Sequence, residues 1–393
     1  MITSNKALEL ILKNIKQLLT TNTTLAKSLN HVLAQDITTP LDFPPFSKSA
    51  MDGYAIAKGD TSAEFKVVGE VAAGQIYLKK ISKGTAIKIM TGAMIPPNTG
   101  QVIMKEHARE LEEDQIKVTK NTSKDNICYQ GEDIKKGSKL FSKGELITPV
   151  MLSNISFTGQ KNIKVYEQPR VGIIVTGSEL LGPGQKYQAG KIYDSNGPLL
   201  TSLLDKLGFT KNTARRAKDS FSALQKTFER VLKNHDVVFF TGGVSVGEYD
   251  FIYDLLKEMG CQIHFNQVSI QPGKPLTFAT YKDKPIFCFP GNPVSVFTCF
   301  YLFALPGLYK MMGYNFRHQI CEHKLSTTFE RSRTERELYY PVKYVEQNKV
   351  EPIKHMGSGD LYSLSKAQGL MIVPIGKKTI YKDSIIKIIR LYA

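Results

Sequence analysis

Three short loops of small residues carry the side chains best suited to chemistry. They read TGSEL from Thr176, TGGVSVGEYD from Thr241 and PGNPVS from Pro290, and each follows an apolar run that is typical of a buried strand. Glycines in such loops let backbone N–H groups approach a phosphate, and the N-terminus of a following helix adds partial positive charge. Together the three loops predict a binding site for a phosphate-bearing ligand.

Carboxylates within these loops predict a cation beside the phosphate. Glu179 lies in the first loop, and Glu248 and Asp250 lie in the second. A carboxylate repels a phosphate unless a cation bridges the two, and Mg²⁺ is the simplest choice. Because the carboxyl ends of parallel strands share one edge of a sheet, we expect the three loops to meet there.

Other kinds of site are not favoured by the motifs. No GxGxxG follows a predicted strand and no Walker A motif is present, which disfavours a dinucleotide or P-loop site. The seven histidines form no HExxH set and the chain has no GxSxG, which disfavours a zinc enzyme and a serine nucleophile. Asp52 and Asp133 lie in glycine-containing turns that a structural Asx turn also explains, and the QPGKP turn is equally compatible with a solvated Lys274.

The elements that must position these loops alternate between strand and helix from residue 169 to residue 318. Apolar strands are predicted at 171–175, 237–240 and 285–289. Helices are predicted from Ser195 or Asn196 to a stop at Gly208, and at 220–234, 250–259 and 294–308. This alternation is typical of a parallel three-layer α/β domain.

The remaining segments are mostly β-rich. Before the α/β domain, strand-like runs occur at 65–71, 86–90, 101–105 and 115–118, and after it at 339–345, 370–373 and 385–391. Residues 1–19 have apolar positions at helical spacing and predict an amphipathic helix that docks on a domain encoded later. The predicted fold class is therefore multidomain α/β, with a three-layer parallel α/β domain, a β-rich N-terminal lobe and a small all-β, barrel-like C-terminal domain.

Composition narrows the partners and the compartment. The 393 residues carry a net charge of +16, but no block concentrates the basic residues. This dispersion favours a compositional bias or a small anionic ligand over nucleic acid. The five cysteines form no CxxC pair, which indicates free thiols in a reducing cytoplasm. No signal-peptide pattern is present, and the most apolar stretch, 294–308, is too short to predict a membrane span.

Nine motifs in a fixed order resemble one known family. SAMDGYA, IMTGAMIP, GEDI, TGSEL, IYDSN, TGGVSVGEYDF, QPGKP, FPGNPVS and GSGDLYSLSKAQGL resemble the MoeA family of molybdopterin molybdenumtransferases, which includes the E domain of gephyrin. The resemblance covers essentially the whole chain and implies an elongated homodimer of four-domain subunits. It implies the following division: a docking helix at 1–19, a linker and dimerisation domain I at 20–40 and 135–168, a β-rich domain II at 41–134, a molybdopterin-binding, MogA-like domain III at 169–318 and a β-barrel-like domain IV at 319–393.

The resemblance also implies an activity and its requirements. Members of this family insert molybdate into adenylylated molybdopterin with release of AMP and use Mg²⁺ or a similar ion. Implied partners are the preceding molybdopterin adenylyltransferase and the proteins that mature molybdoenzymes, with no nucleic acid and no membrane. Two alternatives stay open: adenylylation of molybdopterin with ATP, and a scaffold that binds a protein partner as the gephyrin E domain does.

Site residues are implied by the same motifs. Asp250 would bind Mg²⁺, Glu179 would lie beside it, and Asp52 and Asp133 would join them as catalytic carboxylates from the other lobe. The molybdate oxyanion would be held by Lys274, Ser358 and Arg336. The substrate pocket would further include Thr176, Gly177, Asp219, Thr241, Gly242, Gly243, Ser245, Pro290 and Pro293, with Thr91 from the other lobe.

Two departures from the family pattern affect the predicted oxyanion site. Gln271 and Gln267 stand where the family often has basic residues, so oxyanion binding would depend more on Lys274. Near Glu335, the residues Arg331 and Arg333 compete with Arg336 for the role of oxyanion ligand. The sequence does not separate molybdate from tungstate, since the same donors satisfy both anions.

Overall fold

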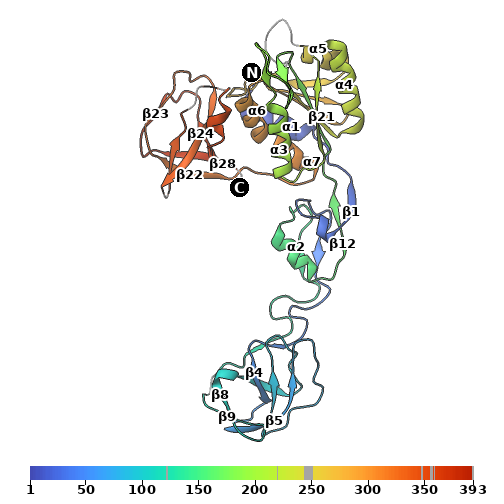
Figure 1. Ribbon diagram of the computed structural model, residues 1–393, viewed down its shortest axis with the longest axis vertical. Helices are drawn as coiled ribbons and strands as arrows, with labels where there is room; N and C mark the ends of the chain where they lie inside the picture. The colour runs from blue at the N-terminus through green and yellow to red at the C-terminus, as the bar shows by residue number, and fades with distance from the viewer. Residues whose placement is uncertain are drawn as a thin grey trace. The chain divides into compact units, whose positions relative to one another are not determined.

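The computed structural model describes residues 1–120, 123–218, 220–242, 251–346, 348–354, 357 and 359–391 (Figure 1). These residues belong to two compact units. The first comprises Met1–Gln35, Gly144–Leu152 and Lys161–Ala393, and the second comprises Asp36–Lys143 and Ser153–Gln160. The finer division into five parts that the resemblance implies stays a prediction.

The centre of the first unit is a six-stranded sheet in the order β16-β13-β17-β21-β20-β18. Its parallel strands are β13 (Val171–Thr176), β16 (Asn212–Ala217), β17 (Val237–Thr241) and β21 (Lys284–Phe289). The antiparallel strands are β20 (Thr277–Tyr281) and β18 (Gln262–Phe265). The predicted parallel sheet is confirmed for four strands, and the other edge is antiparallel because a tight turn joins β20 to β21.

Helices cover both faces of this sheet, so the predicted three layers are confirmed (Figure 1). On one face α3 (Asn196–Lys206) packs with Phe239 and Phe287. On the other face α4 (Phe221–Asn234) and α5 (Phe251–Glu258) pack with Val238 and Phe240. Phe239 faces one layer, and Val238 and Phe240 face the other, because successive side chains of a strand point to opposite faces of the sheet.

The N-terminal helix α1 (Ser4–Asn14) joins the first of these faces. Thr3 caps it by accepting a hydrogen bond from the Lys6 N–H at 3.2 Å, and Ile11 is fully buried. The prediction of a helix as far as residue 19 is too long. Residue Leu19 is 79% exposed, and the chain then enters β1 (Thr20–Thr24), which pairs with β12 (Asn162–Tyr166). The threonines of β1 are β-branched and therefore favour a strand.

A long core helix begins at Pro293, at the end of the PGN loop. It consists of α6 (Pro293–Cys299), a π-turn (Phe300–Ala304) and α7 (Leu305–Met311), and extends three residues beyond the predicted end. Pro306 has no N–H to donate, and the π-turn that precedes it adapts the helix to this loss. Among the described residues, this helix alone is long and apolar enough to cross a membrane, but 94% of it is buried inside the protein.

The C-terminal part of the first unit is a closed barrel, which confirms the barrel-like prediction. The ring closes because β24 (Glu337–Glu346) pairs with both β25 (Lys349–Pro352) and β26 (Gly369–Val373). The other members are β22 (Ile320–Leu325) and β28 (Ile385–Arg390). A two-residue strand, β19 (Ile270–Gln271), joins β24 in parallel.

The second unit is built on another six-stranded sheet, in the order β7-β4-β6-β5-β9-β8. The interior strand β4 (Gly53–Ala57), second from one edge, is buried along its whole length. It was not predicted, since it is short and directly follows a turn. The other strands lie within two residues of the predicted runs or are very short: β5 (Glu64–Val71), β6 (Thr85–Ile89), β7 (Thr99–Met104), β8 (Ala108–Glu110) and β9 (Gln115–Val118).

Smaller elements complete the described chain. They are β2 (Ile37–Thr38), β3 (Lys48–Ser49), β10 (Ile127–Cys128), β11 (Lys139–Phe141), α2 (Pro149–Ser156), β14 (Leu180–Leu181), β15 (Ile192–Tyr193), β23 (Phe329–Glu330), β27 (Thr379–Ile380), α8 (Leu361–Leu364) and the 3₁₀ turns Leu25–Lys27 and Lys105–His107.

Candidate functional site

The three glycine-containing loops meet at the carboxyl edge of the α/β sheet, as expected from the sequence. Gly242 has a φ of +85°, and a Cβ there would lie 2.2 Å from the carbonyl oxygen of Thr176. A Cβ on Gly291 would lie 3.8 Å from Cα of Gly242. The TGSEL and PGN loops are therefore packed backbone to backbone against Gly242, and we call this group of loops the crest.

Strand order explains why a ligand site opens at the crest. From β13 the chain moves to β16 on one side of it and then to β17 on the other. Such a reversal leaves a crevice outside the carboxyl ends of the two central strands. Thr176 and Thr241 end these strands, so both lie at the crevice.

Asn196 is a crest residue that sequence reasoning treated only as a helix cap. Its Nδ2 donates to the carbonyl oxygen of Gly291 at 2.7 Å, which ties α3 to the PGN loop. Its Oδ1 is buried and has no hydrogen-bond partner among the described residues. Nearby, Asp194 accepts from the N–H of Gly197 at 3.0 Å. The IYDSN motif was the available signal, since both residues belong to it.

Oxygen atoms at the crest fit the chemistry of a hard cation such as Mg²⁺. The Oγ1 of Thr241 is buried and, like Oδ1 of Asn196, finds no partner in the described part of the chain. The Glu179 carboxylate folds over Gly177, with Oε1 2.7 Å from where a Cβ on that glycine would lie. Carboxylate, amide and hydroxyl oxygens are the ligands that Mg²⁺ accepts. Within the described residues no three His, Cys, Asp or Glu side chains form a metal cluster.

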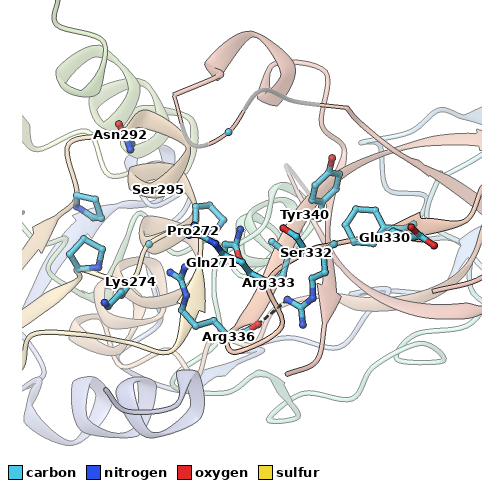
Figure 2. Close-up of a pocket in the computed structure, with 17 residues that line it drawn as sticks. Gln271, Pro272, Lys274, Asn292, Ser295, Glu330, Ser332, Arg333, Arg336 and Tyr340 are labelled. Carbon is cyan, nitrogen blue, oxygen red and sulfur yellow. Dashed lines mark hydrogen bonds between the residues drawn. The ribbon is translucent and has the colours of Figure 1, made fainter. Parts of the chain in front are cut away.

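A cavity of about 700 Å³ adjoins the crest at the PGN loop (Figure 2). It brings Pro290 together with Lys274 and Arg336, three of the residues predicted from the sequence. Its described charged lining comprises four cations and one carboxylate: Lys274, Arg331, Arg333, Arg336 and Glu330. Such an excess of positive charge in a partly enclosed space attracts small anions.

The QPGKP turn is fixed on the core helix rather than free in solvent. Gly273 has a φ of +111°, and a Cβ there would lie 2.5 Å from Sγ of Cys299. The Cys299 thiol donates to the carbonyl oxygen of Gly273 at 3.6 Å, and burial raises the pKa of this thiol, which keeps its proton. The carbonyl oxygen of Lys274 accepts from the Val268 N–H at 2.9 Å. The backbone therefore places Lys274 at the cavity wall.

Two of the arginines that line the cavity differ in their contacts. Arg331 donates to three carbonyl oxygens: that of Lys377 at 2.8 Å, that of Arg336 at 2.9 Å and that of Pro374 at 2.7 Å. Arg336 donates from Nη1 to the carbonyl oxygen of Ile270 at 3.1 Å.

In the second unit the structure pairs two of the predicted residues. The Asp52 carboxylate accepts from the N–H of Thr91 at 2.6 Å and from its Oγ1 at 2.7 Å. The backbone hydrogen bond and then the hydroxyl hydrogen bond lower the pKa of Asp52 below its usual value. Asp133 lies in a separate turn, where its N–H donates to the carbonyl oxygen of Phe43 at 3.0 Å.

Several predicted positions are not described by the structure. They are Asp219, Gly243, Ser245, Glu248, Asp250 and Ser358, and they lie outside the described residues. Gly357, which precedes Ser358 in the chain, lines the cavity, and Pro293 begins α6. The roles of all the predicted site residues stay predictions.

Fold and site together define a multidomain α/β protein with a cationic cavity next to the crest. The chain is 38% identical over 297 residues to the molybdopterin molybdenumtransferase of Staphylococcus aureus (strain COL), covering 74% of this chain and 71% of the relative. The enzyme of the same name from Staphylococcus epidermidis (strain ATCC 12228) is 35% identical over 319 residues, covering 79% and 76%. The chain belongs to the MoeA family of molybdopterin molybdenumtransferases.

Family models and a solved structure agree with this assignment. The models described as MoeA N-terminal region (domain I and II), probable molybdopterin binding domain and MoeA C-terminal region (domain IV) match residues 2–159, 172–310 and 325–390. The crystal structure of the molybdopterin biosynthesis moeA protein from Pyrococcus horikoshii OT3 is similar with a TM-score of 0.82 at 30% identity, covering 99% of both chains. These matches favour the molybdenumtransferase over the adenylyltransferase and scaffold alternatives.

Proposed function

We propose that this chain is a molybdopterin molybdenumtransferase, which inserts molybdate into adenylylated molybdopterin and releases AMP in the synthesis of the molybdenum cofactor. The observation that carries the proposal is the cationic cavity of about 700 Å³, which adjoins the crest in a member of this family. The proposed ligands of the cavity and of the crest are both anions, since molybdate is an oxyanion and adenylylated molybdopterin contains a phosphoanhydride.

The cavity is proposed to hold molybdate. Lys274 presents a point charge from the QPGKP turn, and Arg336 presents a planar fork of donors from the residue before β24. Charge-assisted hydrogen bonds to an oxyanion are stronger than neutral ones. Ser358 would add a hydroxyl donor next to Gly357, which lines the same cavity.

The crest is proposed to hold the pterin phosphate and the anhydride. Because Gly242 has no Cβ, its backbone lies against the carbonyl oxygen of Thr176. Glycines in such a loop let backbone N–H groups approach a phosphate. Thr176, Gly177 and Thr241 would complete the phosphate contacts.

Mg²⁺ is proposed at the same place, held by Asp250 with Glu179 beside it. When bound, the ion neutralises the charge that develops on the phosphate oxygens as the anhydride breaks. The chain itself would bind and orient the anhydride, and the PGN loop would connect it to the cavity through Pro290. Asp52, Thr91 and Asp133 are proposed to act from the second unit, and Asp219, Gly243, Ser245 and Pro293 at the crest.

AMP release tests this proposal. Purified protein is mixed with adenylylated molybdopterin, Mg²⁺ and either molybdate or buffer, and AMP is measured by chromatography. We expect the wild-type protein to release AMP. The rate of AMP release should fall at least tenfold in Asp250→Ala, as expected when a metal ligand is removed. The matched control is Asp383→Ala, a carboxylate in a barrel turn that does not line the cavity. Activity of Asp250→Ala equal to wild type would reject the assigned role.

We also propose that the protein is a cytoplasmic homodimer. Support comes from large apolar side chains that the first unit leaves exposed, with Leu19 at 79% and Val150 at 71%. Exposed apolar surface of this kind is typical of protein interfaces. Light scattering during size-exclusion chromatography would give the mass of the assembly. A monomer of 44.0 kDa at micromolar concentration would reject the dimer. The adenylyltransferase and the molybdoenzyme maturation proteins remain proposed partners.

A further inference from the structure

The cavity wall contains a neutral side chain, Gln271, beside a guanidinium from a different strand. We infer that Arg331 is the positioning residue that holds Arg336, the proposed molybdate ligand, beside Gln271, so that a positive charge stands on the wall where Gln271 is neutral. The inference rests on the proposed function, because it concerns how the cavity binds the molybdate oxyanion. It assigns distinct tasks to arginines that the sequence left in competition.

Strand pairing places Arg336 next to Gln271. The parallel pairing of β19 with β24 sets Ile270 opposite Glu337 and Gln271 opposite Leu338. The Glu337 N–H donates to the carbonyl oxygen of Ser269 at 3.1 Å, which fixes this register at its start. Arg336 directly precedes the paired segment, so it enters the cavity at the level of the residues before the QPGKP turn.

The Arg336 guanidinium is held at this wall and keeps donors for a ligand. Nη1 donates to the carbonyl oxygen of Ile270 at 3.1 Å, the residue before Gln271. A guanidinium has five N–H donors, so this bond leaves others available. Figure 2 shows Arg336 and Lys274 near Gln271, and Glu330 toward the other end of the cavity. An oxyanion between them would contact charge from two different loops.

The carboxylate next to Arg336 in sequence is occupied elsewhere. Glu337 Oε2 accepts from Oγ of Ser4 at 2.7 Å and from the Tyr339 hydroxyl at 2.6 Å. These two bonds hold the carboxylate by α1 and β24, and it does not line the cavity. The positive charge of Arg336 is therefore left for a bound anion.

Arg331 acts through the backbone rather than on the ligand. Its Nε and Nη2 donate to the carbonyl oxygens of Lys377 and Pro374. Its Nη1 donates to the carbonyl oxygen of Arg336, at the other end of its own loop. The bond to Arg336 is the dashed line in Figure 2. The bonds to Pro374 and Lys377 anchor the loop to the segment after β26. Arg331 thus closes residues 331–336 into a fixed loop, which fixes the backbone position from which the Arg336 side chain extends.

Molybdate binding to the full-length protein tests the role of Arg336. Isothermal titration calorimetry with molybdate alone should show that Arg336→Ala raises Kd roughly 10- to 100-fold, the size expected for a charge-assisted hydrogen bond. Adding Gln271→Lys to Arg336→Ala should restore Kd to within about fivefold of wild type, because it returns a cation to the same wall. The matched control, Arg390→Ala, removes an exposed arginine of the barrel that does not line this cavity, and should leave Kd unchanged.

Arg331 is tested by rescue. Arg331→Ala should raise KM for molybdate about tenfold while kcat at saturating molybdate stays within twofold, since the group acts on placement of a ligand. Gln271→Lys should rescue Arg331→Ala as well, because it makes the position of Arg336 unimportant. Damage to the fold alone would lower Tm and would not be rescued by a change at position 271.

Failure of the inference is distinguishable from failure of the proposed function. If wild type binds molybdate and releases AMP but Arg336→Ala binds as tightly, the inference is wrong and the function stands. The same holds if Gln271→Lys rescues neither variant. If wild type neither binds molybdate nor releases AMP, both are rejected.

Discussion

The crest and the cavity adjoin each other in the first unit, yet they are built on opposite principles. At the crest, backbone touches backbone, and the buried polar atoms are neutral: Oγ1 of Thr241 and Oδ1 of Asn196. In the cavity, loops are held by arginine donors and side chains carry the charge. The crest therefore depends on shape and tolerates no added atoms, whereas the cavity depends on charge and tolerates changes in shape.

Adding one methyl group at the crest should have the largest effect. Gly242→Ala would place Cβ 2.2 Å from the Thr176 carbonyl oxygen at a φ of +85°, so the TGSEL and TGG loops must separate. We expect AMP release to fall by about 100-fold or more and stability to fall by roughly 2 to 4 kcal/mol. Activity assays and urea unfolding measure both.

Gly190→Ala is the control for backbone strain at this position. Gly190 also has a positive φ, +77°, but nothing lies within 4 Å of its Cβ position. It should lose only about 1 kcal/mol and little activity. Equal losses in the two variants would show that close packing of the crest loops is not what matters.

The crest was more predictable from sequence than the cavity because its signals are local. An apolar strand run followed by Thr-Gly marks Thr176 and Thr241 without any knowledge of the fold. The meeting of these loops follows from the geometry of parallel sheets. Asn196 shows the limit: the sequence offered Ser195 or Asn196 as the helix cap, and the structure has Ser195 there and begins α3 at Asn196. The bond from Asn196 to Gly291 joins residues 95 positions apart, which no local pattern reveals.

The cavity depends on pairings that no local pattern reveals. Arg336 lies next to Gln271 because β19, a strand of two residues that includes Gln271, pairs with β24. Arg331 is fixed by two carbonyl oxygens more than 40 positions away. Polar strands were missed for a related reason: β16 reads NTARRA and has no apolar alternation, because it lies at the edge of its sheet. Long-range backbone pairing, rather than composition, decided both cases.

His318, just before the barrel, is a buried neutral group like the buried polar atoms of the crest. Burial lowers the pKa of His318 to about 4, and its Nε2 is buried without a partner among the described residues. The unfolded chain binds this proton near pH 6.5, so stability is complete above that pH and is lost as pH falls toward 4. The loss should reach roughly 3 kcal/mol.

Unfolding by urea between pH 4 and 8 measures this loss. The matched variant is His318→Phe, which retains a ring against Phe316, whose centroid lies 5.1 Å from that of His318. Its stability should depend less on pH over the interval from 6.5 to 4. An identical pH profile for the two proteins would assign the effect to other groups.

Cutting the link between α3 and the PGN loop should have a smaller effect that separates the two sites. Asn196→Ala removes the donor to the Gly291 carbonyl oxygen and should cost about 1 to 2 kcal/mol of stability. AMP release should fall about tenfold. Calorimetry should show molybdate Kd within about twofold of wild type, because the change adds or removes no charge in the cavity. A large change in Kd would mean that the crest and the cavity act as one site.

The smallest expected effect is a gain, and it tests whether charge governs the cavity. Glu330 is exposed and is the single carboxylate among the described lining residues. Glu330→Gln removes its repulsion of the anion and should tighten molybdate binding about two- to threefold at low ionic strength. The gain should vanish near 1 M salt, where the screening length is about 3 Å. Glu322→Gln, on β22 outside the cavity, should change neither value. A gain that persists at high salt would instead indicate a local rearrangement of the cavity wall.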